Sequence, residues 1–204
     1  MDLSRRVVTA GLAAARQVSG GNKRGFITLP SFGSFVPAGK KYSDAQVFPY
    51  TKEQVFDVVA DVDRYSEFVP MCMGSRVIRG KQHSEQHSEQ GVVEEAVDAE
   101  LVVGYPPFSE RYMSRVVIER PWRITATAKA NGGIFKHMKT VWEFAEAADK
   151  AGRVCPGKGT LVRFGIEYEF VSILHAQAAS LVFEKMAKTN LEAYLGRCKR
   201  LYDK

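Results

Sequence analysis

Apolar and polar positions alternate along much of this chain, which is the spacing of β-strands that bury one face. From Val162 to Phe170, for example, every second residue is apolar and the charged residues lie between them. The same alternation predicts strands at 72–80, 91–103, 108–119, 122–130, 138–146 and 159–170. We therefore expect a curved antiparallel sheet with one apolar face and one face in water.

Helical signals flank this run of strands. Thr51 and Gln54 have the spacing of a capping box, so a helix is expected after a short strand at 45–48. A second short helix is expected at 64–68 and ends before Pro70. The segment 172–202 contains no proline and carries one apolar stripe at helical spacing. This stripe consists of Ala179, Val182, Phe183, Met186, Ala187, Tyr194, Cys198 and Leu201.

A strand, two short helices, a run of strands and a long final helix are the elements of an α+β, helix-grip fold. In this fold a curved antiparallel sheet wraps around the long C-terminal helix. The predicted domain spans residues 42–204, and its length is enough for one sizeable core. No run approaches 18 apolar residues, so no transmembrane helix is expected.

The basic charge of the chain is concentrated at its beginning. Residues 1–41 contain seven Lys and Arg residues against Asp2 alone, which accounts for the whole net charge of +6. This segment is rich in Ala, Gly, Ser and Arg, which is typical of a mitochondrial transit peptide followed by a linker. A disordered basic tail remains the alternative. The near-neutral remainder argues against direct nucleic-acid binding, which needs a basic patch.

The sequence gives little sign of metal or disulfide chemistry. Cys72, Cys155 and Cys198 are far apart and form no zinc-binding pattern, so free thiols are expected. His83 and His87 belong to a duplicated HSEQ sequence, for which a polar loop is a simpler explanation than a metal site.

The known catalytic motifs are also missing from the sequence, including nucleophile elbows, phosphate-binding loops and metalloprotease motifs. Glu95 and Glu110 fall on the apolar faces of their predicted strands. They could form an acid/base pair. The alternative is that Glu95 reaches water at a strand end and that Glu110 pairs with a nearby arginine.

The large inward side chains of the sheet and of the long helix predict a cavity between them, with small helix residues leaving room. The candidate ligand-binding residues are Trp142, Tyr112, Phe164, Phe183, Met186, Tyr194 and Ala179. An apolar cluster between the second short helix and the next strand is the candidate cavity mouth and membrane contact. It consists of Phe68, Val69, Pro70 and Met71, and core packing is the alternative role for Phe68 and Val69.

Four segments resemble the mitochondrial coenzyme Q-binding Coq10 family of the START-like superfamily. They are FPYTKEQVFDVVADVDRYSEFVPMCMGSRV, PPFSERYMSRVVIERPWRITATA, GGIFKHMKTVWEF and AYLGRCKRLY, and together they extend over about residues 42–202. The resemblance implies a START-like fold without a catalytic cofactor. It also implies binding of ubiquinone as a chaperone or carrier that supports respiratory electron transport and ubiquinone biosynthesis.

The resemblance further implies a place at the matrix side of the mitochondrial inner membrane, as a peripheral protein. Respiratory-chain or quinone-biosynthesis proteins are possible partners. Two other functions stay open at this stage. One is a protein-interaction module that docks on a mitochondrial ribosomal or respiratory assembly, and the other is a cyclase-like enzyme.

Overall fold

The computed structural model describes residues 39–78, 86–87, 93–105, 108–129, 135–149, 151–153, 155, 157–171 and 173–203. The predicted transit peptide and the HSEQ loop, with the exception of Gln86 and His87, lie outside these ranges. The side chains of residues 173–184 and of Met186 also lie outside the description. The predicted boundary between residues 41 and 42 therefore stays a prediction, although the first strand already begins at Lys40.

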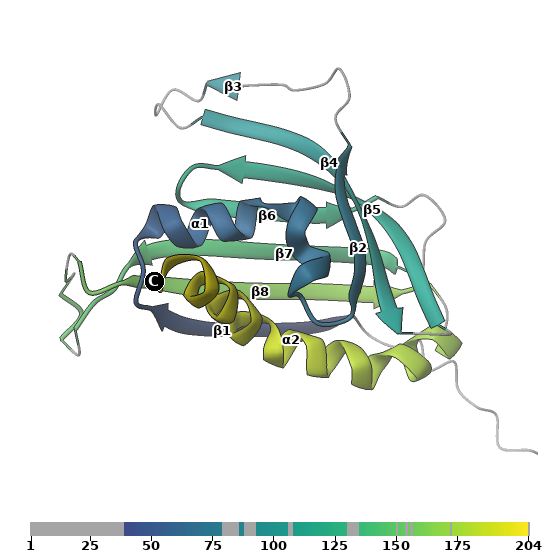
Figure 1. Cartoon of the computed structure of the whole chain (residues 1–204). Coiled ribbons are helices and arrows are strands. Elements are labelled where there is room, and N and C mark those ends of the chain that lie inside the picture. Colours follow the sequence, from purple (N-terminus) through teal and green to yellow (C-terminus); the bar gives the residue numbers. More distant parts are fainter. Residues whose placement is uncertain are drawn as a thin grey trace, which may run out of the picture. The chain divides into compact units, whose positions relative to one another are not determined.

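The described elements follow the predicted order (Figure 1). They are β1 (Lys40–Phe48), α1 (Lys52–Ala60), the 3-10 helix η1 (Val62–Glu67), β2 (Cys72–Ile78), β3 (Gln86–His87), β4 (Val93–Tyr105), β5 (Phe108–Glu119), β6 (Arg123–Ala128), β7 (Phe135–Glu146), β8 (Thr160–Phe170) and α2 (Ile173–Tyr202). The α+β, helix-grip fold is confirmed. No helix in the described part of the chain is both long and apolar enough to span a bilayer.

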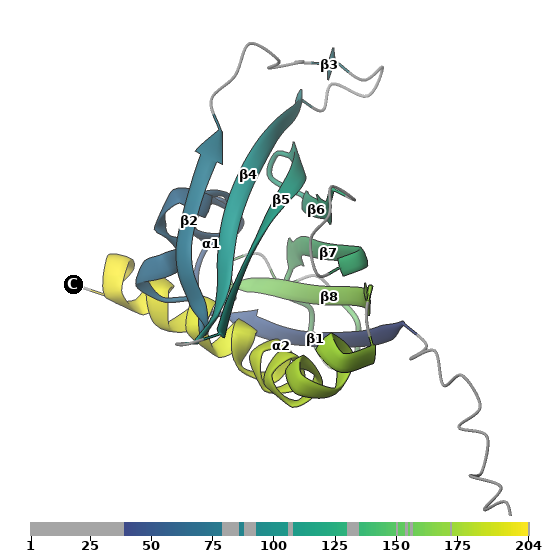
Figure 2. The ribbon, with the colours of Figure 1, turned by 90° about the vertical axis from the view of Figure 1, so that its right-hand side faces the viewer.

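All strand pairs of the sheet are antiparallel, in the order β1-β8-β7-β6-β5-β4-β2, with β3 paired to β4. The sheet bends so strongly that β4 and β2 run steeply across the direction of β8 and β1 (Figure 2). Helices α1, η1 and α2 all lie on the concave side (Figures 1 and 2). Apolar side chains on that side form the core, as the alternation predicts.

Helix α1 begins with the predicted capping box. The Thr51 hydroxyl accepts from the Gln54 N–H at 3.3 Å, and the Gln54 side chain accepts from the Thr51 N–H at 2.9 Å. Val55, Phe56 and Val59 are then fully buried against the sheet. Helix α1 covers part of the concave side, and η1 and α2 lie over other parts of it (Figure 1).

Helix α2 covers the rest of the concave side through its second half. Ala187, Leu191, Tyr194 and Cys198 are buried there. Leu201, predicted on the same stripe, is instead 42% exposed, and that prediction is wrong. The neighbouring Tyr202 packs on Tyr50 with ring centroids 5.9 Å apart, so the last turn of α2 contacts the core through a different face.

The alternation in the predicted strand at 122–130 also places Trp122 on the apolar face with Ile124, and this prediction is wrong. Trp122 precedes β6 in a turn, where its N–H donates to the Glu119 carbonyl at 2.7 Å, and its side chain is 51% exposed. The Lys52 ammonium lies 3.5 Å from the centre of the indole ring. This cation–π contact with α1 holds the side chain outside the core.

Helix η1 is attached to β2 by backbone and side-chain hydrogen bonds. The Asp63 carboxylate accepts from the Val77 N–H at 2.6 Å, and the Ser66 N–H donates to the Ser75 hydroxyl at 3.1 Å. These bonds hold η1 against β2 on the concave side, next to α2. The space between η1, α2 and the sheet is the candidate site.

Candidate functional site

A cavity of about 120 Å³ lies at the junction of the sheet, α2 and η1. The sheet wall consists of side chains from β4 to β8: Leu101, Val103, Tyr112, Ser114, Val116, Ile124, Ala126, Met138, Thr140, Trp142, Phe164 and Ile166. Helix α2 contributes Ala187, Asn190 and Tyr194, and the third side consists of Val62, Tyr65, Val69 and Cys72. The predicted position between helix and sheet is thus where this cavity lies, with η1 as an additional wall.

An aromatic cluster connects the three walls. The Trp142 ring lies 4.6 Å from Phe164 on the neighbouring strand and 4.5 Å from Tyr194 on α2. The Tyr194 ring in turn meets Phe68 edge-on at 5.0 Å and Tyr65 edge-on at 5.5 Å. Such tilted and edge-on contacts are the favourable arrangements of aromatic rings, so the cluster gives the cavity a rigid wall.

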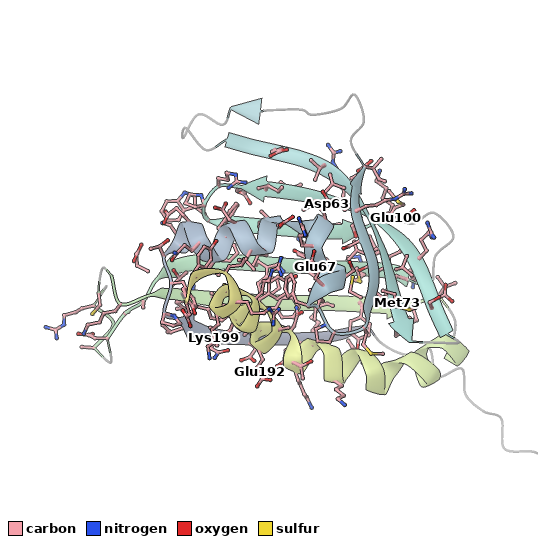
Figure 3. The ribbon with its side chains drawn as sticks, in the orientation of Figure 1. Asp63, Glu67, Met73, Glu100, Glu192 and Lys199 are labelled. Atoms are coloured by element: carbon pink, nitrogen blue, oxygen red, sulfur yellow. The ribbon has the colours of Figure 1, made fainter. Side chains whose placement is uncertain are left out.

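A salt bridge and a cation–π contact hold η1 against α2 beside the cavity. The Arg197 guanidinium lies 3.0 Å from the Glu67 carboxylate and 5.4 Å from the centre of the Phe68 ring. Figure 3 shows Glu67 beside α2, whereas Glu192 and Lys199 project from the outer side of that helix. The ionic contact therefore closes the space between η1 and α2 outside the aromatic cluster.

The polar groups of the cavity wall are neutral. Tyr65, Tyr112 and Tyr194 contribute phenols, and burial raises the pKa of each phenol above its ordinary value of 10. Ser114, Thr140 and Asn190 add hydroxyl and amide groups. None of the described lining residues is an Asp, Glu, Lys, Arg or His, so this part of the cavity suits an uncharged, largely apolar ligand.

The two carboxylates considered as an acid/base pair do not line this cavity. Glu95 is half-buried at one end of β4, and Glu110 is exposed at the beginning of β5. Arg111 pairs with Glu100 at 2.8 Å rather than with Glu110. In the described residues, nothing therefore places a carboxylate where a ligand in the cavity would meet it.

The structure places four of the predicted ligand-binding residues on the cavity wall, namely Trp142, Tyr112, Phe164 and Tyr194. The side chains of Phe183, Met186 and Ala179 lie outside the described residues, so their predicted role stays a prediction. Ala187 lies further along α2 than Ala179 and is the small helix residue that the structure shows on the cavity wall.

The four residues of the predicted mouth segment lie in different environments. Val69 lines the cavity, and Phe68 packs against Tyr194 and Tyr65. Pro70 and Met71 are partly exposed beside them. The backbone of Met71 is left-handed, with φ at 63°, and its carbonyl accepts from the Gly104 N–H at 2.9 Å. Membrane contact by this segment stays a prediction.

Sequence reasoning missed several residues of the site. Tyr65 and Cys72 were not considered because they flank the mouth segment rather than lie on a periodic face. Asn190 had a detectable signal, because it is a polar residue three positions after Ala187 and four before Tyr194 on a buried stripe. Ser114 is 1% exposed and occupies an inward position of β5 that alternation alone identifies.

The part of the chain that forms the sheet and the cavity also matches a known protein family. Residues 48–194, from the end of β1 to the helix wall of the cavity, match the model of the family described as polyketide cyclase / dehydrase and lipid transport. The chain belongs to this family. Because its description includes both enzymes and lipid transport, family membership leaves the choice between them to the site.

Two relatives of this chain have names that state different functions. Coenzyme Q-binding protein COQ10 homolog B, mitochondrial, from Xenopus laevis is 33% identical over 162 residues, which are 79% of this chain and 59% of the frog protein. The ribosome association toxin RatA from Pseudomonas aeruginosa is 26% identical over 156 residues, which are 76% of this chain and 93% of the toxin. The chain thus spans less than two thirds of the frog relative.

A solved structure confirms the fold at greater distance. The Zhui aromatase/cyclase from Streptomyces sp. R1128 superposes with a TM-score of 0.61 over 80% of this chain and 95% of the cyclase, with 15% sequence identity. At this identity the likeness shows the shared fold alone.

Proposed function

We propose that this chain binds coenzyme Q (ubiquinone) in the described cavity and acts as a quinone chaperone or carrier. The single observation behind this proposal is a cavity with aromatic walls, a few neutral hydrogen-bonding groups and no charged side chain among the lining residues that the structure describes. A quinone ring is flat, uncharged and carries carbonyl oxygens, which suits such a lining. The frog relative, named as a coenzyme Q-binding protein, supports the choice of ligand.

The volume of the cavity limits what it holds. A cavity of ~150 Å³ lined by apolar side chains accommodates one benzene molecule, so a substituted quinone ring fills the described cavity of about 120 Å³ and extends past it. The isoprenoid tail then extends beyond the described cavity. Transfer of each tail CH₂ from water to an apolar environment gains about 0.8 kcal/mol. A bilayer offers nearly the same gain, so a quinone can exchange between protein and membrane.

The proposed membrane contact follows from this exchange. Phe68, Val69, Pro70 and Met71 lie beside η1, and Val69 reaches the cavity wall. We propose that this segment touches the matrix side of the mitochondrial inner membrane as a peripheral contact. Support of respiratory electron transport and ubiquinone biosynthesis, and contact with proteins of these pathways, belong to the same proposal.

Mass spectrometry of a lipid extract from the purified domain tests the binding function. We expect ubiquinone close to one molecule per folded protein after expression in a quinone-producing host. Extraction of an abundant non-quinone lipid instead, with no quinone above the level of an unrelated purified protein, would refute the assignment of the ligand.

Quinone affinity should not depend on pH between 6 and 9. The phenols of Tyr65, Tyr112 and Tyr194 have pKa values raised above 10 by burial, so all three stay protonated below their raised pKa values. Equilibrium titration with a short-tailed ubiquinone at several pH values measures this, with circular dichroism as the folding control. A change of tenfold or more within this range, in folded protein, would show that an ionisable group contributes to binding.

Import into mitochondria should depend on the basic residues of the leader. The run between Asp2 and Asp44 contains no acidic residue, and mitochondrial leaders are poor in such residues. Replacement of Arg5, Arg6 and Arg16 by Glu should abolish import of the full chain into isolated mitochondria. A matched triple change to Lys retains the charge and should import normally. Equal import of both variants would refute the leader proposal.

A non-enzymatic role is part of the proposal, since the lining residues within the described ranges include no carboxylate. The variants Glu95→Gln and Glu110→Gln should retain full quinone content. A turnover of substrate that either change removed would instead favour a cyclase-like enzyme. The RatA relative supports a second candidate function, docking on a mitochondrial ribosomal assembly. Co-sedimentation of the ligand-free domain with mitochondrial ribosomes tests this candidate.

A further inference from the structure

Each of the three walls of the cavity contributes one tyrosine. Tyr65 belongs to η1, Tyr112 to β5 and Tyr194 to α2, and all three line the cavity. Burial raises the pKa of Tyr112 and Tyr194, and interaction with the neighbouring phenols raises both further. Together with Ser114, Thr140 and Asn190, the three phenols are the main hydrogen-bonding groups of a lining that is otherwise mostly apolar.

Two of the three hydroxyl protons already have acceptors. The Tyr65 hydroxyl donates to the backbone carbonyl of Val59 at the end of α1. The Tyr194 ring meets the Tyr65 ring edge-on at 5.5 Å. Beside the effect of burial, the interaction of the two hydroxyls raises the pKa of Tyr194 and lowers that of Tyr65, which is the pattern of Tyr194 as donor and Tyr65 as acceptor. This chain of hydrogen bonds fixes both side chains and satisfies both protons within the protein.

The Tyr112 hydroxyl differs from the other two. No residue in the described part of the chain accepts a hydrogen bond from it. Its ring is nevertheless held in place, because the Phe135 ring meets it edge-on at 5.4 Å and the β5 backbone pairs it with Leu101. Tyr112 is therefore a fixed residue of the cavity wall whose hydroxyl donates to no acceptor among the described residues.

We propose that Tyr112 donates a hydrogen bond to a ring carbonyl oxygen of the ligand and so selects a neutral, carbonyl-bearing ring. This inference rests on the proposed function and adds the residue that orients the ring. A carbonyl that enters an apolar cavity loses its hydrogen bonds to water, and a waiting donor replaces one of them. A hydrocarbon ring of the same shape gains nothing from this donor, so the hydroxyl discriminates between the two.

The variant Tyr112→Phe tests the proposal, because it removes the hydroxyl and retains the ring. The probes are a ubiquinone with a two-isoprene tail and an arene with the same tail and the same other substituents but without the two ring carbonyls. Loss of one hydrogen bond should weaken quinone binding about tenfold, and arene binding should change less than twofold. The matched control is Tyr202→Phe, which removes a phenol hydroxyl away from the cavity and should alter neither affinity.

The outcomes separate this inference from the proposed function. If the wild-type protein binds neither probe, the proposed function fails and the inference with it. If the wild type binds the quinone and Tyr112→Phe binds it equally well, only the role of Tyr112 is wrong. Should Tyr112→Phe not fold, the wild-type protein alone decides, because equal affinity for the quinone and the arene would overturn the proposal.

Discussion

The variant Ala187→Phe should lose at least nine tenths of the quinone that co-purifies with the wild-type protein. Ala187 is 5% exposed and lines the cavity from the helix side. A phenyl group there would occupy space of about the size that one ring needs, as in the ~150 Å³ cavity that holds a single benzene. A packed core resists such an addition, whereas a cavity accepts it with little strain. The measurement is quinone per folded protein by lipid extraction and mass spectrometry.

Lys188→Phe is the matched control for this experiment. Lys188 is the next residue on α2 and is exposed, so the same change there adds a phenyl group outside the cavity. Both variants should melt within a few degrees of the wild type. Unchanged quinone content in a folded Ala187→Phe variant would place the ligand elsewhere, with the Phe68 to Met71 segment as the next candidate.

The variant Phe56→Ala should have the opposite pattern, with a large loss of stability and no specific loss of binding. Phe56 is fully buried, meets Phe144 edge-on at 5.3 Å and lies under the Arg120 guanidinium at 4.9 Å. Removal of a buried phenyl group costs about 3–5 kcal/mol. For a domain of this size, such a loss lowers the melting temperature by roughly 6–20 °C.

Chemical denaturation of Phe56→Ala measures the loss, and Val47→Ala is the control. Val47 is 48% exposed on β1, so its truncation should change stability by less than about 0.5 kcal/mol. Quinone content per folded molecule should remain at the wild-type level in both variants, because neither residue lines the cavity. A loss below about 1 kcal/mol in Phe56→Ala would show that the region around α1 rearranges to fill the space.

Most of the fold could be predicted from local patterns. The pleat of a strand fixes a period of two, so alternation along 108–119 identifies β5 with its observed ends. The capping box at Thr51 is equally local, because its two hydrogen bonds involve residues three positions apart. Antiparallel neighbours then follow, since short connections join consecutive strands β4 to β7.

The errors arose where a distant contact overrides the local pattern. Trp122 continues the alternation of β6 in the sequence, but Lys52 of α1 holds its ring outside the core. Leu201 continues the apolar stripe of α2, but Tyr50 draws the adjacent Tyr202 inward. In both cases the partner lies far away in the sequence, and spacing along the chain carries no information about it.

The same distinction between local patterns and contacts of distant residues applies to the site. The sequence by itself determined the concave apolar face, the long helix across it and four aromatic residues on the cavity wall, because each depends on the period of a strand or a helix. Only the tertiary structure brought Tyr65, Tyr112 and Tyr194 together from three elements, and only it assigned their hydrogen-bond partners. Those partners are contacts in space rather than in sequence, so spacing along the chain could not show that the Tyr112 hydroxyl donates to no acceptor among the described residues.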